Sequence, residues 1–317
     1  MRRILVASLT ILLGLSLGVT YAQTSKLPED DSYSTTGPIP PPGVVFQRAT
    51  KDLVPGKVIS GVPEYLWYNG CGPTAAGMVI GYYDGLGHKL VPGDATTQTA
   101  AANKMIASAE HYDDYSLPLD TRDDIQPDRS EWPSGDEHQD NCVADYMRTS
   151  QSVLDLPYGW SRFSDVDDAF EGYLHEVTPW VSMSVQNLSW EDLTWEDFRA
   201  EIDADRPVVL LVDTDADGAS DHFVTAIGYG DDDGTPMYAC FDTWEFGTGW
   251  YEFAQRIEGQ PWGIYGATFL HITGPALTPA NNSVGVAAAA LAIIILAAVY
   301  LNRRSPARQR SDYLGKS

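Results

Sequence analysis

The chain has few basic side chains for its length. Its 317 residues include 20 lysines and arginines against 44 aspartates and glutamates, which gives a formal charge of −24. Phosphate contacts need clustered Lys and Arg, so this balance excludes a nucleic-acid-binding protein. There is no internal repeat and no Walker A motif, and the latter excludes a nucleotide-driven transporter. The apolar fraction of 44% is ordinary for a packed domain and rules out wholesale disorder.

Cysteine is almost absent. Only Cys71, Cys142 and Cys240 occur, and three thiols cannot all pair within one chain. One of them therefore stands apart from any disulfide. A bond between Cys142 and Cys240 would suit an exported protein, but the sequence leaves open whether it forms.

The N-terminal end has the layout of a secretory signal. Two arginines precede an uncharged apolar run from Ile4 to Val19, and small or neutral residues follow up to Ala22. This pattern predicts a cleavable signal peptide over residues 1–22. An uncleaved anchor is the alternative.

The C-terminal end predicts a membrane helix. Residues 284–301 carry no charge and would span roughly 27 Å at about 1.5 Å per residue, enough for a bilayer core. Four arginines follow in the tail 302–317, and basic residues mark the cytoplasmic side. We therefore expect an exported, single-pass protein at the cell surface, with its body outside. A removable sorting signal and a buried core helix are the alternatives.

The remaining chain divides into a folded body and two connecting segments. Prolines predict an extended linker over residues 23–47, and residues 275–283 form a shorter spacer. The body, residues 48–274, is long enough for a substantial core.

Within the body, helical patterns come first and strand patterns later. Helices are predicted over about 72–84, 97–112, 141–147, 164–174 and 194–202. Strands are predicted over 207–213, 223–229, 237–242, 250–257 and 266–272. This order predicts an α+β fold.

Cys71 is the candidate nucleophile. It lies in the segment YLWYNGCGPT, a turn that leads into a helix. A thiol at a helix N-terminus feels the positive end of the dipole, which lowers its pKa and favours the thiolate. The other interpretation is a structural thiol at a tight turn.

His222 is the candidate base for that thiol, because a nucleophile needs a base held in the right tautomer. It opens the strand-like run HFVTAIGY, and Asp242 closes the next predicted strand. Adjacent antiparallel strands can bring a His and an Asp side by side on one face. Cys71, His222 and Asp242 therefore form a predicted triad, although each polar residue alone is more often structural.

Four segments resemble an exported branch of the papain-like cysteine peptidases, similar to the bacteriocin-processing peptidases that remove double-glycine leaders. They are YLWYNGCGPTAAGMVIGYYD, DNCVADYM, DHFVTAIGYGDD and CFDTW. The resemblance covers most of residues 58–274, although residues 86–135 match no part of it. It implies a papain-like fold, with Cys71 on a helical half, His222 and Asp242 on a β half, and a cleft between them.

The oxyanion-hole position departs from the family pattern. The family has a glutamine a few residues before the cysteine, whereas this chain has Glu64. An ionised carboxylate accepts hydrogen bonds and cannot donate one to an oxyanion. Asn69 and the main-chain N–H of Cys71 are the alternative donors. Loss of such a donor would lower the rate about a hundred- to thousandfold.

An acidic loop precedes His222. Asp213, Asp215 and Asp217 have the D-x-D-x-D-G spacing of a calcium loop, but Val224 stands where the bidentate glutamate belongs. The loop is either an incomplete calcium site or an acidic β-turn, and we favour the turn. No cofactor is required, and calcium is the one candidate.

Together these features predict a membrane-anchored, extracytoplasmic cysteine peptidase. Its substrate would be a peptide or a protein, cleaved through the triad by an acyl-enzyme. A catalytically silent surface-binding module on the same fold and an acyl-transfer enzyme are the alternatives.

Overall fold

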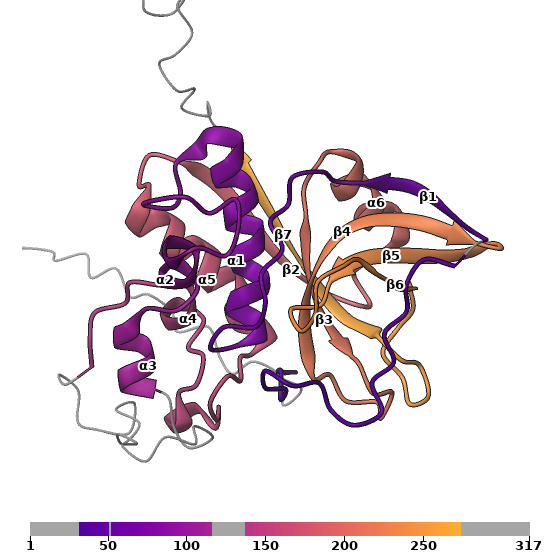
Figure 1. The fold of residues 1–317 in the computed structure, drawn as a ribbon, viewed down its shortest axis with the longest axis horizontal. Helices are drawn as coiled ribbons and strands as arrows, with labels where there is room; N and C mark the ends of the chain where they lie inside the picture. Colours follow the sequence, from indigo (N-terminus) through magenta and orange to yellow (C-terminus); the bar gives the residue numbers. More distant parts are fainter. Residues whose placement is uncertain (1–31, 51, 116–136, 274–317) are drawn as a thin grey trace, which may run out of the picture. The chain divides into compact units, whose positions relative to one another are not determined.

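A computed structural model describes residues 32–50, 52–115 and 137–273. Figure 1 shows the helices α1 to α5 gathered on one side and the sheet on the other. The predicted signal peptide, spacer, membrane helix and tail lie outside the described residues. None of the helices that the structure describes is long and apolar enough to cross a bilayer.

The helices are short, and most of them precede the sheet in the chain. They are α1 (Cys71–Tyr83), the π-helical η1 (Asp84–His88), α2 (Ala100–Ile106), α3 (Ala109–Tyr115), α4 (Val143–Tyr146), the 3₁₀ turns η3 (Ser152–Leu154) and η4 (Phe163–Asp165), α5 (Val166–Val177) and α6 (Trp195–Asp203). Every residue of α1 is buried, so this helix is the centre of the helical half.

Within the described residues the sheet has seven strands, and the pairings between these strands are all antiparallel. They are β1 (Leu53–Val58), β2 (Ser182–Ser189), β3 (Val208–Asp213), β4 (His222–Asp232), β5 (Thr235–Phe241), β6 (Gly249–Glu252) and β7 (Gly263–Thr273). Their order is β2-β7-β3-β4-β5-β6, and β1 pairs with the end of β4. All six residues of β3 are buried, as its run of Val and Leu predicts.

The two halves meet where α1 packs against β3 and β4. The hydroxyl of Thr225, in β4, donates a hydrogen bond of 2.9 Å to the carbonyl of Ala75, in α1. The hydroxyl of Tyr83 donates at 2.9 Å to the carbonyl of Leu270, in β7. Both ends of α1 are therefore tied to the sheet, which fixes the start of this helix relative to the start of β4.

The predicted α+β class is confirmed, with differences in detail. The helix predicted over 97–112 is two helices, because the chain is extended at Ala107. Ser164 lies inside η4 and does not cap α5, whereas Thr194 does cap α6 by accepting from the N–H of Asp197. Strands β1 and β2 were not predicted.

Residues 32–47 also differ from the linker predicted over 23–47. The indole N–H groups of Trp244 and Trp262 donate to main-chain carbonyls of this stretch, at 2.9 and 3.0 Å. Extended chain leaves its main-chain groups free for such partners. Proline content predicts the extension correctly, but it does not show that tryptophans far along the sequence bind the segment.

Replacing Thr225 with valine tests the tie between the two halves. Valine keeps the shape of threonine but removes the hydroxyl that reaches Ala75, so we expect the free energy of unfolding to fall by about 1 kcal/mol. Urea denaturation measures it. Thr273→Val is the control, because its hydroxyl also binds a carbonyl, that of Ser182, at an exposed strand end. Equal losses in the two variants would contradict a special role for the Thr225 contact.

Candidate functional site

A sharp turn presents Cys71 at the first position of α1. Asn69 has a φ of 55° and Gly70 a φ of 150°, both in the region that disfavours most side chains. A Cβ on Gly70 would lie 2.9 Å from side-chain atoms of Pro73 and Thr149. Only glycine fits there, and the turn it permits aims the Cys71 side chain toward the sheet.

His222 is the first residue of β4 and is fully buried. Pairing of β4 with β5 brings the chain beyond Phe241 back beside it. The Nε2 atom lies 2.6 Å from the main-chain carbonyl oxygen of Asp242. The Trp244 ring stacks on the imidazole, with ring centroids 3.6 Å apart. These two contacts fix the position and the orientation of the imidazole.

The carbonyl contact also sets the tautomer of His222. A carbonyl oxygen can only accept, so Nε2 carries the proton. Burial lowers the pKa of His222 to about 3, which keeps the ring neutral at ordinary pH. Nδ1 is therefore unprotonated and free to accept a proton, which is the state a general base requires.

The carboxylate of Asp242 has a different role from the one predicted. Its Oδ1 accepts from the main-chain N–H groups of Trp244, at 2.8 Å, and Glu245, at 3.0 Å. Its Oδ2 is buried without a hydrogen-bond partner among the described residues. Asp242 does lie beside His222, but it holds the imidazole through its main chain, while its carboxylate shapes the turn that carries Trp244.

Thr36 lies between Cys71 and His222. Its Oγ1 is 2.6 Å from Nδ1 of His222 and 3.8 Å from Sγ of Cys71. No direct hydrogen bond joins Cys71 to His222 in the described part of the chain. Since Nδ1 is an acceptor, the Thr36 hydroxyl donates to it. The base therefore faces the N-terminal segment and not the thiol.

Burial decides the charge state of Cys71. Burial raises the thiol pKa, which hydrogen bonds from the Phe223 N–H and from the Ser34 hydroxyl lower in part. The pKa that the helix N-terminus was expected to lower is thus raised. Desolvation of a fully covered thiolate outweighs the helix dipole here. With Thr36 in place, the site holds a neutral thiol and a neutral imidazole.

The two predicted oxyanion-hole residues have other partners. The carboxylate of Glu64 accepts a hydrogen bond from the main-chain N–H of Gly247, a residue of the loop that follows Asp242. The side-chain oxygen of Asn69 accepts the hydroxyl of Tyr158 at 2.6 Å. Neither contact involves Cys71. The main-chain N–H of Cys71, at the start of α1, is the donor best placed for an oxyanion.

The acidic loop before β4 brings its three carboxylates together, with ligand atoms within 4.8 Å of one another. Asp213 accepts the N–H groups of Ala216 and Gly218, at 2.8 and 2.7 Å. Asp215 and Asp217 each accept a hydrogen bond from the main-chain N–H of the residue two positions later in the chain. Val224 is buried in β4 and has no side-chain oxygen. These contacts fit the acidic turn that the sequence favoured, and the incomplete calcium site stays the alternative.

The predicted disulfide is not formed, since all three cysteines are free and buried. Cys240 lies in β5, in the sheet, and Cys142 caps α4, in the helical half. Each thiol thus belongs to a different part of the fold. Sequence shows that the two residues could pair, but it does not show where their side chains lie.

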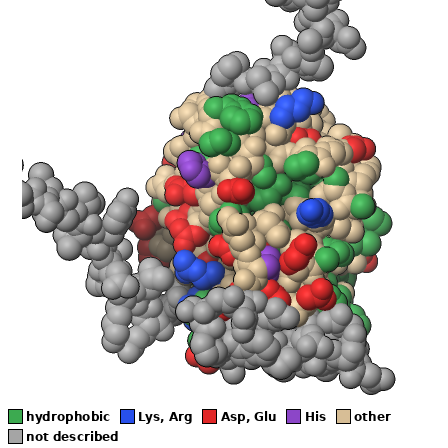
Figure 2. Space-filling view, turned by 90° about the vertical axis from the view of Figure 1, so that its left-hand side faces the viewer, with side chains coloured by type: hydrophobic (Ala, Val, Ile, Leu, Met, Phe, Trp, Pro, Cys, Tyr) green, Lys and Arg blue, Asp and Glu red, His purple; other side chains and the backbone are tan. Residues whose placement is uncertain are grey.

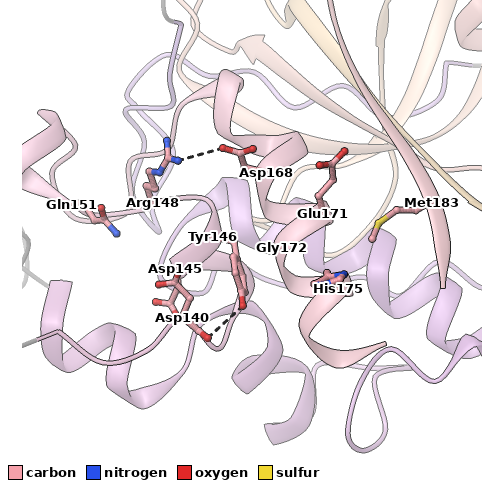
Figure 3. Close-up of a pocket in the computed structure, with 10 residues that line it drawn as sticks. All are labelled: Asp140, Asp145, Tyr146, Arg148, Gln151, Asp168, Glu171, Gly172, His175 and Met183. Atoms are coloured by element: carbon pink, nitrogen blue, oxygen red, sulfur yellow. Dashed lines mark hydrogen bonds and ion pairs between the residues drawn. The ribbon is translucent and has the colours of Figure 1, made fainter. Parts of the chain in front are cut away.

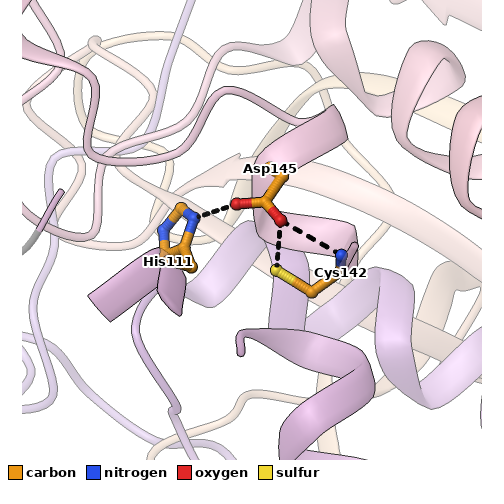
Figure 4. Close-up of side chains that lie close together, drawn as sticks. All are labelled: His111, Cys142 and Asp145. Carbon is orange, nitrogen blue, oxygen red and sulfur yellow. Dashed lines mark hydrogen bonds and ion pairs between the residues drawn. The ribbon is translucent and has the colours of Figure 1, made fainter. Parts of the chain in front are cut away.

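Cys142 belongs to a second group of polar side chains, and Figure 4 draws its members His111, Cys142 and Asp145. Asp145 accepts from the Cys142 thiol at 3.1 Å and lies 2.7 Å from Nδ1 of His111 and 3.1 Å from Nε2 of His138. Despite burial, the two histidines hold the pKa of Asp145 well below its usual range. These are ligand types that zinc takes. The carboxylate also accepts the N–H groups of Asn141 and Cys142, so Asp145 caps α4, whereas Nε2 of His111 is buried without a hydrogen-bond partner among the described residues.

A cavity of about 710 Å³ lies beside this network, in the helical half (Figure 3). Asp140, Asp168 and Glu171 line it together with Arg148, which pairs with Asp168 at 3.4 Å. Cys71 and His222 are not among its lining residues. Figure 2 shows acidic side chains spread over this side of the molecule, with few lysines and arginines. The cavity is therefore an acidic surface hollow and not the site of the thiol.

Sequence reasoning missed Thr36, Asp221 and Trp244. Thr36 lies in a stretch interpreted as linker. Asp221 contributes its main-chain carbonyl, which no side-chain pattern reveals, and burial raises the pKa of its carboxyl to about 7. Both Asp221 and Trp244 lie in quoted segments, since Asp221 opens DHFVTAIGYGDD and Trp244 follows Asp242 by two residues in CFDTW.

Comparison with known proteins gives one match. The model of a family described as Peptidase_C39 like matches residues 47–268, a range that includes Cys71, His222 and Asp242. No curated protein matches the chain.

Asp242→Asn tests the buried charge beside His222. Burial raises the pKa of Asp242 from 3.8 to about 6, so the native carboxyl holds its proton more tightly than the unfolded one. That contribution to stability is complete below about pH 4 and is lost as the pH rises through 6. The variant has no such loss. We expect its stability relative to the parent to rise by about 2 kcal/mol between pH 4 and pH 7.

Urea denaturation across this pH range measures the effect. Asp231→Asn is the control, because Asp231 is exposed and also accepts a turn N–H, that of Gly234. Its stability difference from the parent should stay flat. A flat profile for Asp242→Asn as well would show that this carboxylate is solvated.

Proposed function

The chain belongs to the peptidase C39-like family, and on that premise we propose that it is an extracytoplasmic cysteine peptidase in which Cys71 is the nucleophile and His222 the general base. Membership confirms the resemblance and the papain-like fold predicted from the sequence. It supports a peptidase-related function and a peptide or protein substrate. Export and a membrane anchor at residues 284–301 rest on the sequence pattern alone.

The observation that carries the proposal is the unprotonated Nδ1 of His222, which lies 2.6 Å from the Thr36 Oγ1 atom that is itself 3.8 Å from Sγ of Cys71. When Thr36 is displaced, Nδ1 can take the thiol proton. The Phe223 N–H, 3.5 Å from Sγ, and the N-terminus of α1 then stabilise the thiolate. Asp242 positions the imidazole and stabilises its protonated form by accepting the Nε2 proton in a hydrogen bond.

The reaction then follows the chemistry of an acyl-enzyme. The Cys71 thiolate attacks the peptide carbonyl carbon, and the main-chain N–H of Cys71 stabilises the oxyanion. The C–N bond breaks as the imidazolium of His222 gives its proton to the leaving amine. A thioester remains on Cys71. His222 next takes a proton from water, the hydroxide attacks the thioester, and the thiolate leaves with a carboxylic acid as product.

A silent binding module on the same fold is the second candidate. The raised pKa of Cys71 and the absence of a direct Cys71–His222 hydrogen bond among the described residues favour it. The missing hydrogen bond follows from Thr36 lying between the two side chains, and the raised pKa follows from the burial of the thiol. The candidates therefore separate in an experiment that measures bond cleavage.

We expect the full-length protein to hydrolyse peptides in a mixed library, with products identified by mass spectrometry. Cys71→Ala and His222→Ala should each lower the rate by at least about a thousandfold, because the nucleophile and the base act as one unit. Cys240→Ala is the control, since it removes another buried thiol that lies outside the site. Cleavage that persists in Cys71→Ala, or that falls equally in Cys240→Ala, would contradict the assignment. Binding of peptides without cleavage would favour the silent module.

A further inference from the structure

Residues 32–37, here called the N-terminal strap, run between the two halves of the fold. On one side Ser34 donates its main-chain N–H to Ser161 at 2.9 Å, and the carbonyl of Ser32 accepts from Phe163 at 2.9 Å. On the other side Thr35 donates to the carbonyl of Asp221 at 2.9 Å. The strap is therefore held by main-chain hydrogen bonds from both halves, which is how a groove holds an extended peptide.

The side chains of the strap alternate between the groove and the solvent. Ser32, Ser34 and Thr36 are buried, at 8%, 0% and 3% exposure, whereas Tyr33 and Thr35 are exposed. This period of two is that of an extended strand. The three inward residues are all small and carry a hydroxyl, so the groove has room only for small side chains at alternate positions.

Each inward hydroxyl has a polar partner. The Ser32 Oγ accepts from Arg256 at 3.0 Å, and the Ser34 Oγ accepts from the Ser161 N–H at 3.1 Å. The Thr36 hydroxyl donates to Nδ1 of His222. The strap thus ends, on its inward face, at the atom that has to take the proton of Cys71.

We propose that the groove between residues 161–163 and Asp221 is a binding site for extended peptides with small side chains at alternate positions, and that the strap is its resident occupant. The inference rests on the proposed function for the fate of a bound peptide, though not for the binding itself. While the strap is seated, Cys71 and His222 are fully buried and His222 is engaged by Thr36. A substrate reaches Cys71 only after the strap has left.

Ser34→Phe tests the occupancy in the full-length chain. The buried Ser34 has no room for a phenyl ring, so the variant should unseat the strap. Alkylation by iodoacetamide at pH 8, mapped by mass spectrometry, reports access to Cys71. We expect labelling of Cys71 to become at least about tenfold faster, as for a site released from a closed state. Cys240 serves as an internal reference and should stay slow, because unfolding would expose both thiols.

Ile39→Phe is the matched control, since Ile39 is 78% exposed and lies just beyond the strap. Its Cys71 labelling should equal that of the parent. Thr36→Gly is a milder second variant, which removes the hydroxyl at His222 without adding bulk. Unchanged labelling of Cys71 in both strap variants would overturn the proposal. Slower labelling in Thr36→Gly would also overturn it, because Thr36 would then relay the proton of Cys71.

A synthetic peptide with the sequence of residues 32–37, Ser-Tyr-Ser-Thr-Thr-Gly, tests the groove directly. Added to Ser34→Phe, it should slow the labelling of Cys71 again. The same peptide with Phe at its third position should not. Protection by both peptides, or by neither, would overturn the stated preference for small inward side chains.

These results separate the strap from the peptidase. Faster labelling in Ser34→Phe and protection by the peptide, without any hydrolysis, would support the groove and refute the peptidase. Equal hydrolysis by Ser34→Phe and Ile39→Phe would support the peptidase and overturn the strap as the occupant that has to leave.

Discussion

The packing of α1 against β4 is the constraint on which the rest of the site depends. Cys71 is the first residue of one element and His222 the first residue of the other, 151 positions apart in the sequence. The hydrogen bond from Thr225 to Ala75 ties the two elements one helical turn from the thiol. Small shifts of either element would separate the thiol from the imidazole, so the many buried residues of α1 keep the proposed nucleophile and base in place through rigidity.

Desolvation governs the electrostatics that this packing creates. It raises the pKa of the Cys71 thiol and lowers that of His222, so both groups are neutral while the strap is seated. The same neutral imidazole, with its proton fixed on Nε2 by a carbonyl, is the correct starting state for a base. In the closed site the proposed general base is already unprotonated at Nδ1. What is missing is a direct contact between Nδ1 and the thiol of Cys71.

The sequence predicted that Cys71 and His222 would lie at one site better than it predicted what surrounds them. Cys71 and His222 follow from local signals, a Gly-flanked helix start and a strand start, and the structure brings both to one place. For Asp242 the sequence predicted a neighbour of His222, but not that its carbonyl makes the contact, because main-chain contacts leave no residue-type signal. The sequence did not predict that Thr36 lies in the site, for another reason. Its stretch looks like linker by composition, and its partners, the carbonyl of Asp221 and the imidazole of His222, lie far along the chain.

The strap also explains why so ordinary a residue as threonine lies at the centre of the site. A hydroxyl is small enough to enter the space between Sγ and Nδ1, and it can donate to an unprotonated imidazole without a charge. A carboxylate there would bring an uncompensated charge into a dry site. An apolar side chain would leave Nδ1 buried and unpaired. Among the twenty residues, a short hydroxyl therefore closes the site at the lowest cost while leaving a contact weak enough for a peptide to replace.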